Sequence, residues 1–303
     1  MPRKAVCLWI LSLIITNPLQ AGYAQETPLS SDSSMAYTLR YGMTHGKVLR
    51  YKETSKQVVE LKIPEIGMDL SSESTLTKDY TLSFISRDGN KNIKMAVTIN
   101  DITSVGHSNS GKTDIDFSKA KGKTFHLMMT DLGKVLQYIG VEGLNDRKIH
   151  QSGMIISIGV ENSFNTVLLE LPPKAIRFGE TWKAEKSSTI LNLDGVEQTI
   201  VYSILCTFEG LEKIDGRECL KIKTYRIGTI TGAGTTTSLF KSYSEFHGQF
   251  ESFGTVYIDP EEVVVIKGNN TSFIHGEISI RSFTGQYVEP FKRQTTIELL
   301  LVQ

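Results

Sequence analysis

The sequence predicts a mainly β protein with a minor α component (α+β), built around one large curved antiparallel sheet, and three observations support this fold class. Apolar and polar residues alternate in several segments, short turn signals separate these segments, and only one stretch has helical periodicity. Alternation with a period of two is typical of strands with one buried and one solvent-facing side. Many hairpins and few helical stretches therefore indicate a single large antiparallel sheet.

The first residues have the layout of a secretory signal peptide. Arg3 and Lys4 precede an apolar run over residues 5–15, and the small residues of Gly22-Tyr23-Ala24 suit a cleavage site. The run is shorter than the ~20 residues that a membrane-spanning helix needs. We therefore expect residues 1–24 to be removed, leaving an exported, soluble protein, periplasmic or secreted, with no membrane span.

The remaining chain is expected to hold one domain after a short leader. Residues 25–36 are polar and small, which is typical of a flexible leader. Residues 37–303 form the β-rich domain, with a helical stretch near 145–171. The flanking parts, 37–145 and 172–303, echo each other in pattern. This echo fits either duplicated halves or two sets of ordinary hairpins, and of the two we favour duplication.

Strands and turns can be placed from the alternation. Residues 80–84, 93–99 and 296–301 each alternate apolar with mostly polar side chains, which predicts strands with one buried face. Clusters of Asp, Gly, Asn and Lys predict the turns. These turn signals lie at residues 87–90, 131–134, 194–195, 215–216 and 267–270.

One segment has the apolar spacing of an amphipathic helix. Phe164, Val167, Leu168 and Leu171 stand at i, i+3, i+4 and i+7, and Pro172-Pro173 would end the helix. Residues 154–158 before it are apolar and partly β-branched, so helix and strand both remain open there.

Charge and cysteine content exclude several classes of protein. The chain has 33 basic and 33 acidic side chains, which argues against nucleic-acid binding because phosphate neutralisation requires a basic surplus. Three cysteines are too few for a disulfide scaffold. Removal of the signal peptide would leave Cys206 and Cys219 as the one pair.

The register of a hairpin argues against a bridge between these two cysteines. If Asp215-Gly216 is a two-residue turn, Ile214 faces Arg217 and Cys219 faces Glu212. Cys206 would then lie six residues, about 20 Å, further along the strand.

The residues around each candidate catalytic or cofactor motif do not fit the site that the motif would need. Residues 106–113 fit the G-x-x-x-x-G-K-[ST] phosphate-loop pattern, but that loop must open a helix, and residues 114–117 alternate like a strand. We interpret the motif as a polar hairpin turn. His275 and Glu277 would share one face of a strand, but two ligands do not make a metal site. The carboxylates of 259–262 fit a turn that begins with Asp-Pro. We expect no catalytic residue, no metal and no cofactor.

The segment 171–182, with its Pro-Pro, extended stretch and Gly-Glu-Thr-Trp ending, resembles a family of uncharacterised exported bacterial proteins. Residues 211–222 and 116–123 are similar to hairpins of the same family. Those proteins in turn resemble the lipoprotein-localisation carriers and their sorting-protein relatives. The resemblance implies a curved antiparallel half-barrel with a helical segment across its mouth, a hydrophobic cavity and no catalytic residues.

These observations lead to two functional hypotheses and a weaker third. The first is a non-enzymatic cell-envelope protein that binds a hydrophobic small molecule or lipid in the half-barrel, with Trp182, Met128 and Met129 as candidate lining residues. Adaptable methionines suit such a lining, although packing inside the core is their competing role. The second is a structural or interaction module with a fully packed core and an envelope protein as partner. A hydrolase or nucleotide-binding protein is the third.

Overall fold

The computed structural model describes residues 35–42, 46–63, 68–108, 111–112, 117–118, 120–141, 149–151, 154–156, 167–192, 196–236, 242–282 and 285–302. These residues form fourteen strands and contain no helix. The first eight are β1 (Val48–Ile63), β2 (Met68–Arg87), β3 (Ile93–Ser108), β4 (Gly111–Lys112), β5 (Thr124–Met129), β6 (Val135–Ile139), β7 (Ile149–Gln151) and β8 (Met154–Ile156). The others are β9 (Thr181–Asn192), β10 (Val196–Ile214), β11 (Arg217–Thr236), β12 (Ser242–Asp259), β13 (Val264–Ser282) and β14 (Gly285–Val302).

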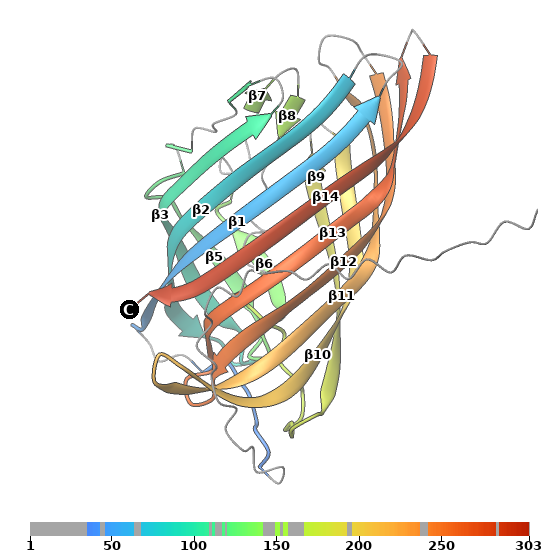
Figure 1. Ribbon diagram of the computed structural model, residues 1–303. Helices are drawn as coiled ribbons and strands as arrows, with labels where there is room; N and C mark the ends of the chain where they lie inside the picture. Colours follow the sequence, from blue (N-terminus) through green and yellow to red (C-terminus); the bar gives the residue numbers. More distant parts are fainter. Residues whose placement is uncertain are drawn as a thin grey trace, which may run out of the picture.

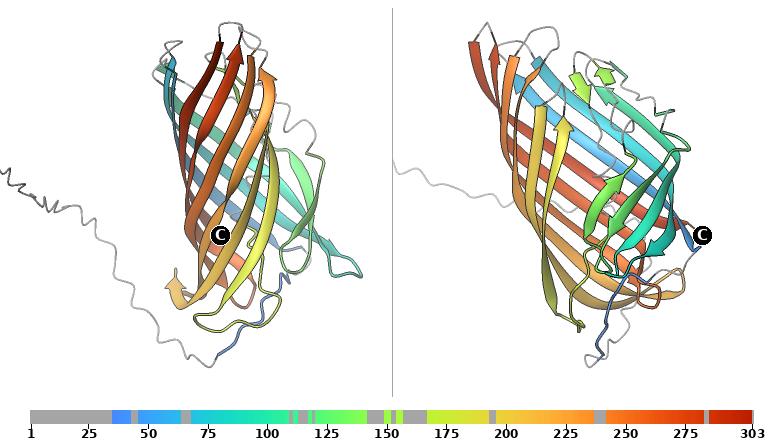
Figure 2. Two further views of the ribbon diagram at one scale, coloured as in Figure 1. Left: turned by 90° about the vertical axis from the view of Figure 1, so that its right-hand side faces the viewer. Right: turned by 180° about the vertical axis from the view of Figure 1, so that it is seen from behind.

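Twelve of the strands form one antiparallel sheet. Its order is β6-β5-β3-β2-β1-β14-β13-β12-β11-β10-β9, with β4 paired to β3 alone, while β7 and β8 form a separate hairpin. The last strand, β14, pairs with the first, β1, at the middle of the sheet. The sheet is not closed, because β6 and β9 are edge strands that do not pair with each other. Figures 1 and 2 show how strongly the long strands tilt and curl, so that the sheet has a concave inner face.

The predicted large antiparallel sheet is therefore confirmed, and so is the alternation from which it was predicted. β3 begins with four buried residues that alternate strictly with four half-buried ones, and the buried ones, Ile93, Met95, Val97 and Ile99, all face the concave side. Tyr80 and Leu82 of β2 and Leu299 of β14 are buried on the same face.

Most of the hydrophobic core lies at one end of the sheet, which we call the packed end. It holds the β10–β11 turn, the C-terminal end of β14 and the strands β5 and β6. Fully buried aromatic and aliphatic side chains fill it, and Tyr51 and Tyr80 stack there with ring centroids 5.8 Å apart. The opposite end, which we call the distal end, carries the start of β12 near Tyr243 and the start of β14 near Gln286.

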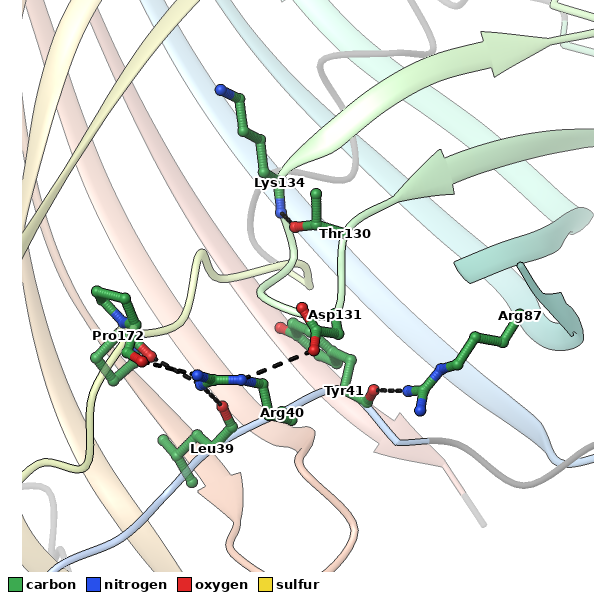
Figure 3. Close-up of polar contacts among 9 residues, drawn as sticks. Leu39, Arg40, Tyr41, Arg87, Thr130, Asp131, Lys134 and Pro172 are labelled. Carbon is green, nitrogen blue, oxygen red and sulfur yellow. Dashed lines mark hydrogen bonds and ion pairs between the residues drawn. The ribbon is translucent and has the colours of Figure 1, made fainter. Parts of the chain in front are cut away.

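Two extended segments connect the edges of the sheet at the packed end, and we call them the strap: residues 35–42 and 167–178. Tyr37 forms a two-way backbone bridge with Ile176, with both N···O distances 2.9 Å. The Tyr41 N–H donates to the carbonyl of Asp131 in the β5–β6 turn. Figure 3 shows how Arg40 joins these parts, donating to the carbonyl oxygens of Leu39, Pro172 and Pro173.

The structure does not show the predicted helix across the mouth. Within 145–171 it describes two short strands, β7 and β8, and an extended run from Leu168, while residues 145–148, 152–153 and 157–166 lie outside the described residues. The reason is burial on more than one side: Val167, Leu168, Leu169 and Leu171 are all buried, whereas a helix would turn some of them to solvent. The backbone groups of this run bond to other segments, as in Leu171 N–H to Leu132 O at 2.8 Å.

The turn predictions have mixed outcomes. Asp215-Gly216 forms the two-residue β10–β11 turn with positive φ at both residues, and turns at 87–90 and 131–134 are also present. The turn predicted at 267–270 is wrong, because these residues continue β13. Their polar groups are used inside the sheet: the Asn269 side-chain oxygen accepts the Thr255 N–H, and Asn270 accepts the Ser252 hydroxyl. The predicted turn at 194–195, the signal peptide 1–24 and most of the leader 25–36 lie outside the described residues.

Candidate functional site

The concave face changes character from the packed end to the distal end. Register pairs align its side chains in rows that run across the strands. One row close to the packed end is apolar on β10–β12, with Phe208, Ile222 and Val256. On β1 and β2 the same row holds a buried ion pair between Glu53 and Lys78, with an N···O distance of 2.5 Å.

A polar row crosses the concave face further along. Its members are the six residues Arg226, Ser252, Ser272, Thr295, Gln57 and Ser74, on β11, β12, β13, β14, β1 and β2. In this polar row the Ser252 hydroxyl donates to Oδ1 of the neighbouring Asn270 at 2.6 Å, and the Ser272 hydroxyl donates to the Thr295 carbonyl at 3.4 Å. The row offers hydroxyl and amide groups where a simple hydrophobic core would place aliphatic side chains.

Arg226 is the most unusual member of the polar row. Its side chain is 93% buried, as the residue is only 7% exposed, and its Nε has no hydrogen-bond partner. No ion pair of Arg226 occurs within the described part of the chain. Burial of a charged group is costly unless it is paired and hydrogen-bonded. Arg226 therefore marks this position as a candidate site.

Lys186, Glu170 and two neutral groups surround Arg226. Lys186 faces inward from β9 opposite Tyr202. On β10, Tyr202 and Cys206 lie two residues before and two residues after Ile204, which is the register partner of Arg226. Burial lowers the pKa of Lys186, with Glu170 opposing this shift and Arg226 adding to it. Burial likewise raises the pKa of Cys206 to about 12, and both cations act against that shift. We call Arg226, Lys186 and Glu170, with Tyr202 and Cys206 between them, the cationic cluster.

Apolar side chains lie directly beyond the cationic cluster, toward the distal end. The Tyr202 ring meets the Phe250 ring edge-on at 5.4 Å, and Gly228 lies between them in the register. A side chain at Gly228 would clash, since its Cβ would be 2.1 Å from the Val201 carbonyl oxygen. The glycine therefore allows the two rings to meet over β11.

This apolar area, which we call the distal cluster, is partly open to solvent. Ile230, Phe246 and Ile274 are buried at its base, whereas Phe250 and Phe291 are only half-buried. Phe246 and Phe291 pack edge-on at 5.2 Å. Thus the inner face of the distal half still exposes apolar surface.

Arg293 lies beside the distal cluster on β14, opposite Ile274. Burial lowers its pKa to about 10, so it remains charged at neutral pH. Like Arg226, it has no ion-pair partner among the residues that the structure describes. The concave face therefore presents a third cation, next to apolar side chains and apart from Arg226 and Lys186.

The three residues predicted to line a ligand site lie in three different environments. Trp182 faces inward next to Cys206 and donates its indole N–H to the Glu170 carbonyl at 2.8 Å, so it borders the cationic cluster. Met129 is fully buried in the core at the packed end. Met128, its neighbour in a strand, points to the opposite face and is half-buried. The structure does not bring the three together.

The other motifs have structural roles. His107 pairs with Lys112 and Ser108 with Gly111, so the phosphate-loop pattern is a β3–β4 hairpin, as predicted, with its two central residues outside the described range. Asp259 Oδ1 accepts the N–H groups of Glu261 and Glu262, which confirms the predicted turn.

No metal site and no membrane-spanning helix are found in what the structure describes. His275 and Glu277 are exposed on the convex face, and His275 stacks on Phe273. No group of three or more potential ligands gathers in the described ranges. Within the same ranges, no helix is long and apolar enough to cross a membrane.

The cationic cluster was missed from the sequence, although a signal for it exists. The turn at Asp215-Gly216 fixes which residues of β11 face inward: Leu220, Ile222, Thr224 and then Arg226. A charged residue in phase with buried apolar ones is the signal. By the same alternation, Lys186 lies on the inward face of β9 with Trp182, and Arg293 lies on the inward face of β14 with Leu299.

Comparison with known proteins adds little to this description. No protein-family model and no curated protein matches the chain. Among solved structures, the chain is similar to one titled "Crystal Structure of Pseudomonas aeruginosa OccK7 (OpdD)", at 9% sequence identity and a TM-score of 0.25, covering 86% of this chain and 100% of that chain. At this TM-score the likeness supports no argument about fold or function.

Proposed function

We propose that this protein is a non-enzymatic, exported protein of the cell envelope that binds a hydrophobic or lipidic ligand on the concave face of its sheet. The signal-peptide pattern of residues 1–24 supports export. One observation carries the binding proposal: the distal cluster keeps apolar surface, including Phe250 and Phe291, half-exposed inside a curved sheet. Largely apolar, concave surfaces with a few polar groups are typical of ligand sites.

The proposal is tested by native mass spectrometry and a neutral fluorescent probe. Protein starting at Gln25, purified from an exporting host, is expected to carry a stoichiometric apolar adduct that solvent extraction removes. The extracted protein should then bind N-phenyl-1-naphthylamine, an uncharged probe whose emission rises in apolar surroundings. A clean mass together with no probe binding would contradict the proposal.

Two substitutions on β14 provide a matched pair for this test. Phe291 faces the distal cluster, whereas Val288 is 52% exposed on the convex face three residues away. Phe291→Gln should weaken probe binding about tenfold or more, since it removes apolar contact area. Val288→Gln should leave binding unchanged. Equal effects of both substitutions would place the probe elsewhere.

A second candidate function is an interaction module of the envelope. It is favoured by a different observation: apolar side chains are exposed side by side on the convex face of β10–β12. They are Leu205, Tyr225, Ile227 and Phe253. If this surface mediates association, sedimentation velocity should detect a complex that Ile227→Lys abolishes, and the neutral probe should not bind the concave face.

A further inference from the structure

The buried guanidinium of Arg226 lacks the partners that such a group requires. It stands in phase with the buried residues Ile222 and Thr224 on β11, and its Nε donates to nothing. Removing a charge from water without pairing it is strongly unfavourable. A protein keeps such a group where another anion completes it, and a guanidinium is well suited to bind a carboxylate or phosphate through two parallel hydrogen bonds.

The surroundings of Arg226 leave a positive excess. Lys186 is the second cation of the cationic cluster, and its pKa is lowered by burial and by Arg226. Glu170 is the acid that acts on Lys186, Tyr202 and Cys206, and it forms no ion pair with either cation among the described residues. Two cations against one carboxylate leave room for one further negative charge.

Apolar surface continues directly from this positive site. Tyr202 belongs to the cationic cluster and packs edge-on against Phe250 of the distal cluster. In the register the same row continues through Ile274 to Arg293. An anionic group held by Arg226 would thus have apolar side chains beside it and a further cation, Arg293, at the far end of the row.

We infer that the ligand of the concave face is an amphiphile with an anionic head group, a carboxylate or a phosphate, which Arg226 and Lys186 bind while its apolar part packs against Phe250 and the distal cluster. The inference rests on the proposed function and adds the chemical class of the ligand. It also assigns Arg226 and Lys186 as the residues that select this class.

The test compares probes of equal chain length that differ in head group. Dodecanoate, dodecyl phosphate and dodecanol are each titrated against protein that holds N-phenyl-1-naphthylamine. Dodecanoate and dodecyl phosphate should displace the dye at concentrations about tenfold lower than dodecanol, since hydrogen bonds to charged groups are worth about that factor. Equal displacement by all three would overturn the inference while leaving the proposed function intact. If neither the dye nor dodecanol binds, both fall.

Variants of the two cations identify the residues responsible. Arg226→Met and Lys186→Met should each reduce the advantage of dodecanoate over dodecanol to about threefold or less. The concentration of dodecanol that displaces the dye should be the same in these variants as in the parent protein. Lys223→Met and Lys183→Met are the matched controls, because these lysines lie on the convex face of the same two strands. Arg226→Met should also leave the thermal midpoint unchanged or raise it, since an unpaired buried charge is removed. An advantage that survives in both cluster variants would overturn the assignment.

Inorganic phosphate separates an amphiphile from a free anion. Added alone, it should fail to stabilise the protein at the concentrations at which dodecyl phosphate raises the thermal midpoint. Stabilisation by both at the same concentration would mean that the anion alone is recognised, and it would overturn the amphiphile as the ligand class.

Discussion

At the scale of single residues, the two cysteines show how register decides chemistry. Cys219 faces Glu212 across the β10–β11 hairpin, as the sequence predicts from the Asp215-Gly216 turn, and Cys206 pairs with Thr224. Both thiols are free and buried. Burial raises the pKa of Cys206 to about 12 and that of Cys219 to about 11.

We therefore expect both thiols to be unreactive in the folded protein. The thiolate is the reactive form, and raised pKa values keep both groups protonated at pH 8. Ellman's reagent should detect close to no thiol in native protein starting at Gln25 and two thiols per chain in denaturant. One or no thiol in denaturant would reveal a disulfide and contradict the structure.

The raised thiol pKa values also give a direction for the pH dependence of stability. Because both values are higher in the folded than in the unfolded chain, their contribution to stability is present below the ordinary thiol pKa of about 8.5 and is lost as the pH rises toward 11 and 12. The free energy of unfolding should fall between pH 8 and pH 10 in urea titrations. Cys206→Ala should reduce that slope, whereas a slope unchanged in the variant would mean that this thiol does not contribute.

Residue-level prediction from the sequence succeeded where spacing alone decides orientation and failed where packing decides it. The hairpin register of Cys219 follows from a turn of two residues, so it needed no knowledge of other strands. The sequence pattern alone could not tell which of Met128 and Met129 is buried in the core, because this depends on which face of β5 meets the core. The inward orientation of Arg226 can be predicted from the alternation along β11. Its lack of a hydrogen-bond partner at Nε becomes visible only when β9, β10 and β11 are placed together.

At the scale of elements, the described end of the predicted helical stretch, residues 167–171, is extended and belongs to the strap. Val167, Leu168 and Leu171, which stand at helical spacing in the sequence, are instead buried in an extended segment that lies between the edges of the open sheet. The Tyr41 hydroxyl donates to the Leu169 carbonyl at 2.9 Å inside the core, and the Trp182 indole donates to Glu170. The carbonyls of this run are thus bonded without a helix. Local periodicity cannot reveal these distant donors.

Gly133, in the β5–β6 turn, tests how tightly the strap is held. Its φ is +82°, and a Cβ there would be 2.6 Å from both the Leu169 carbonyl oxygen and the Tyr41 ring. Gly133→Ala should therefore cost about 1 kcal/mol of backbone strain and a further 1–3 kcal/mol of steric displacement. Emission of Trp182 should also shift to longer wavelength, since its bond to Glu170 belongs to the displaced segment.

Gly122→Ala is the control for this prediction. Gly122 also has a positive φ, +75°, but nothing lies within 4 Å of its Cβ position. The control should lose about 1 kcal/mol, consistent with backbone strain alone, and keep the Trp182 emission of the parent. Equal losses in the two variants, measured by urea unfolding, would show that the strap does not press on the β5–β6 turn.

At the scale of the whole molecule, one continuous sheet connects the packed end to the distal end, whose concave face is partly open to solvent. Backbone hydrogen bonds run the length of the long strands, so the difference between the ends lies in what covers the concave face. At the packed end, Leu299 of β14 is buried in the core, whereas Phe291 and Tyr287 of the same strand are half-exposed. An antiparallel sheet of this size is predictable from alternation, but this gradient depends on where a few polar side chains interrupt it.

The gradient predicts unequal hydrogen exchange along single strands. Amides of 297–301 in β14 should be protected nearly to the level of global unfolding, and those of 287–293 should exchange orders of magnitude faster, because local opening there exposes little additional apolar surface. Pulse-labelling mass spectrometry of overlapping peptides measures both parts in one experiment, and their register partners in β1, residues 51–55 and 59–61, should show the same contrast. If a ligand fills the concave face, dodecanoate should slow exchange in the distal segments and leave the packed segments unchanged. Uniform protection along β14 and β1 in the free protein would instead favour a core that is packed from end to end, and with it the interaction module.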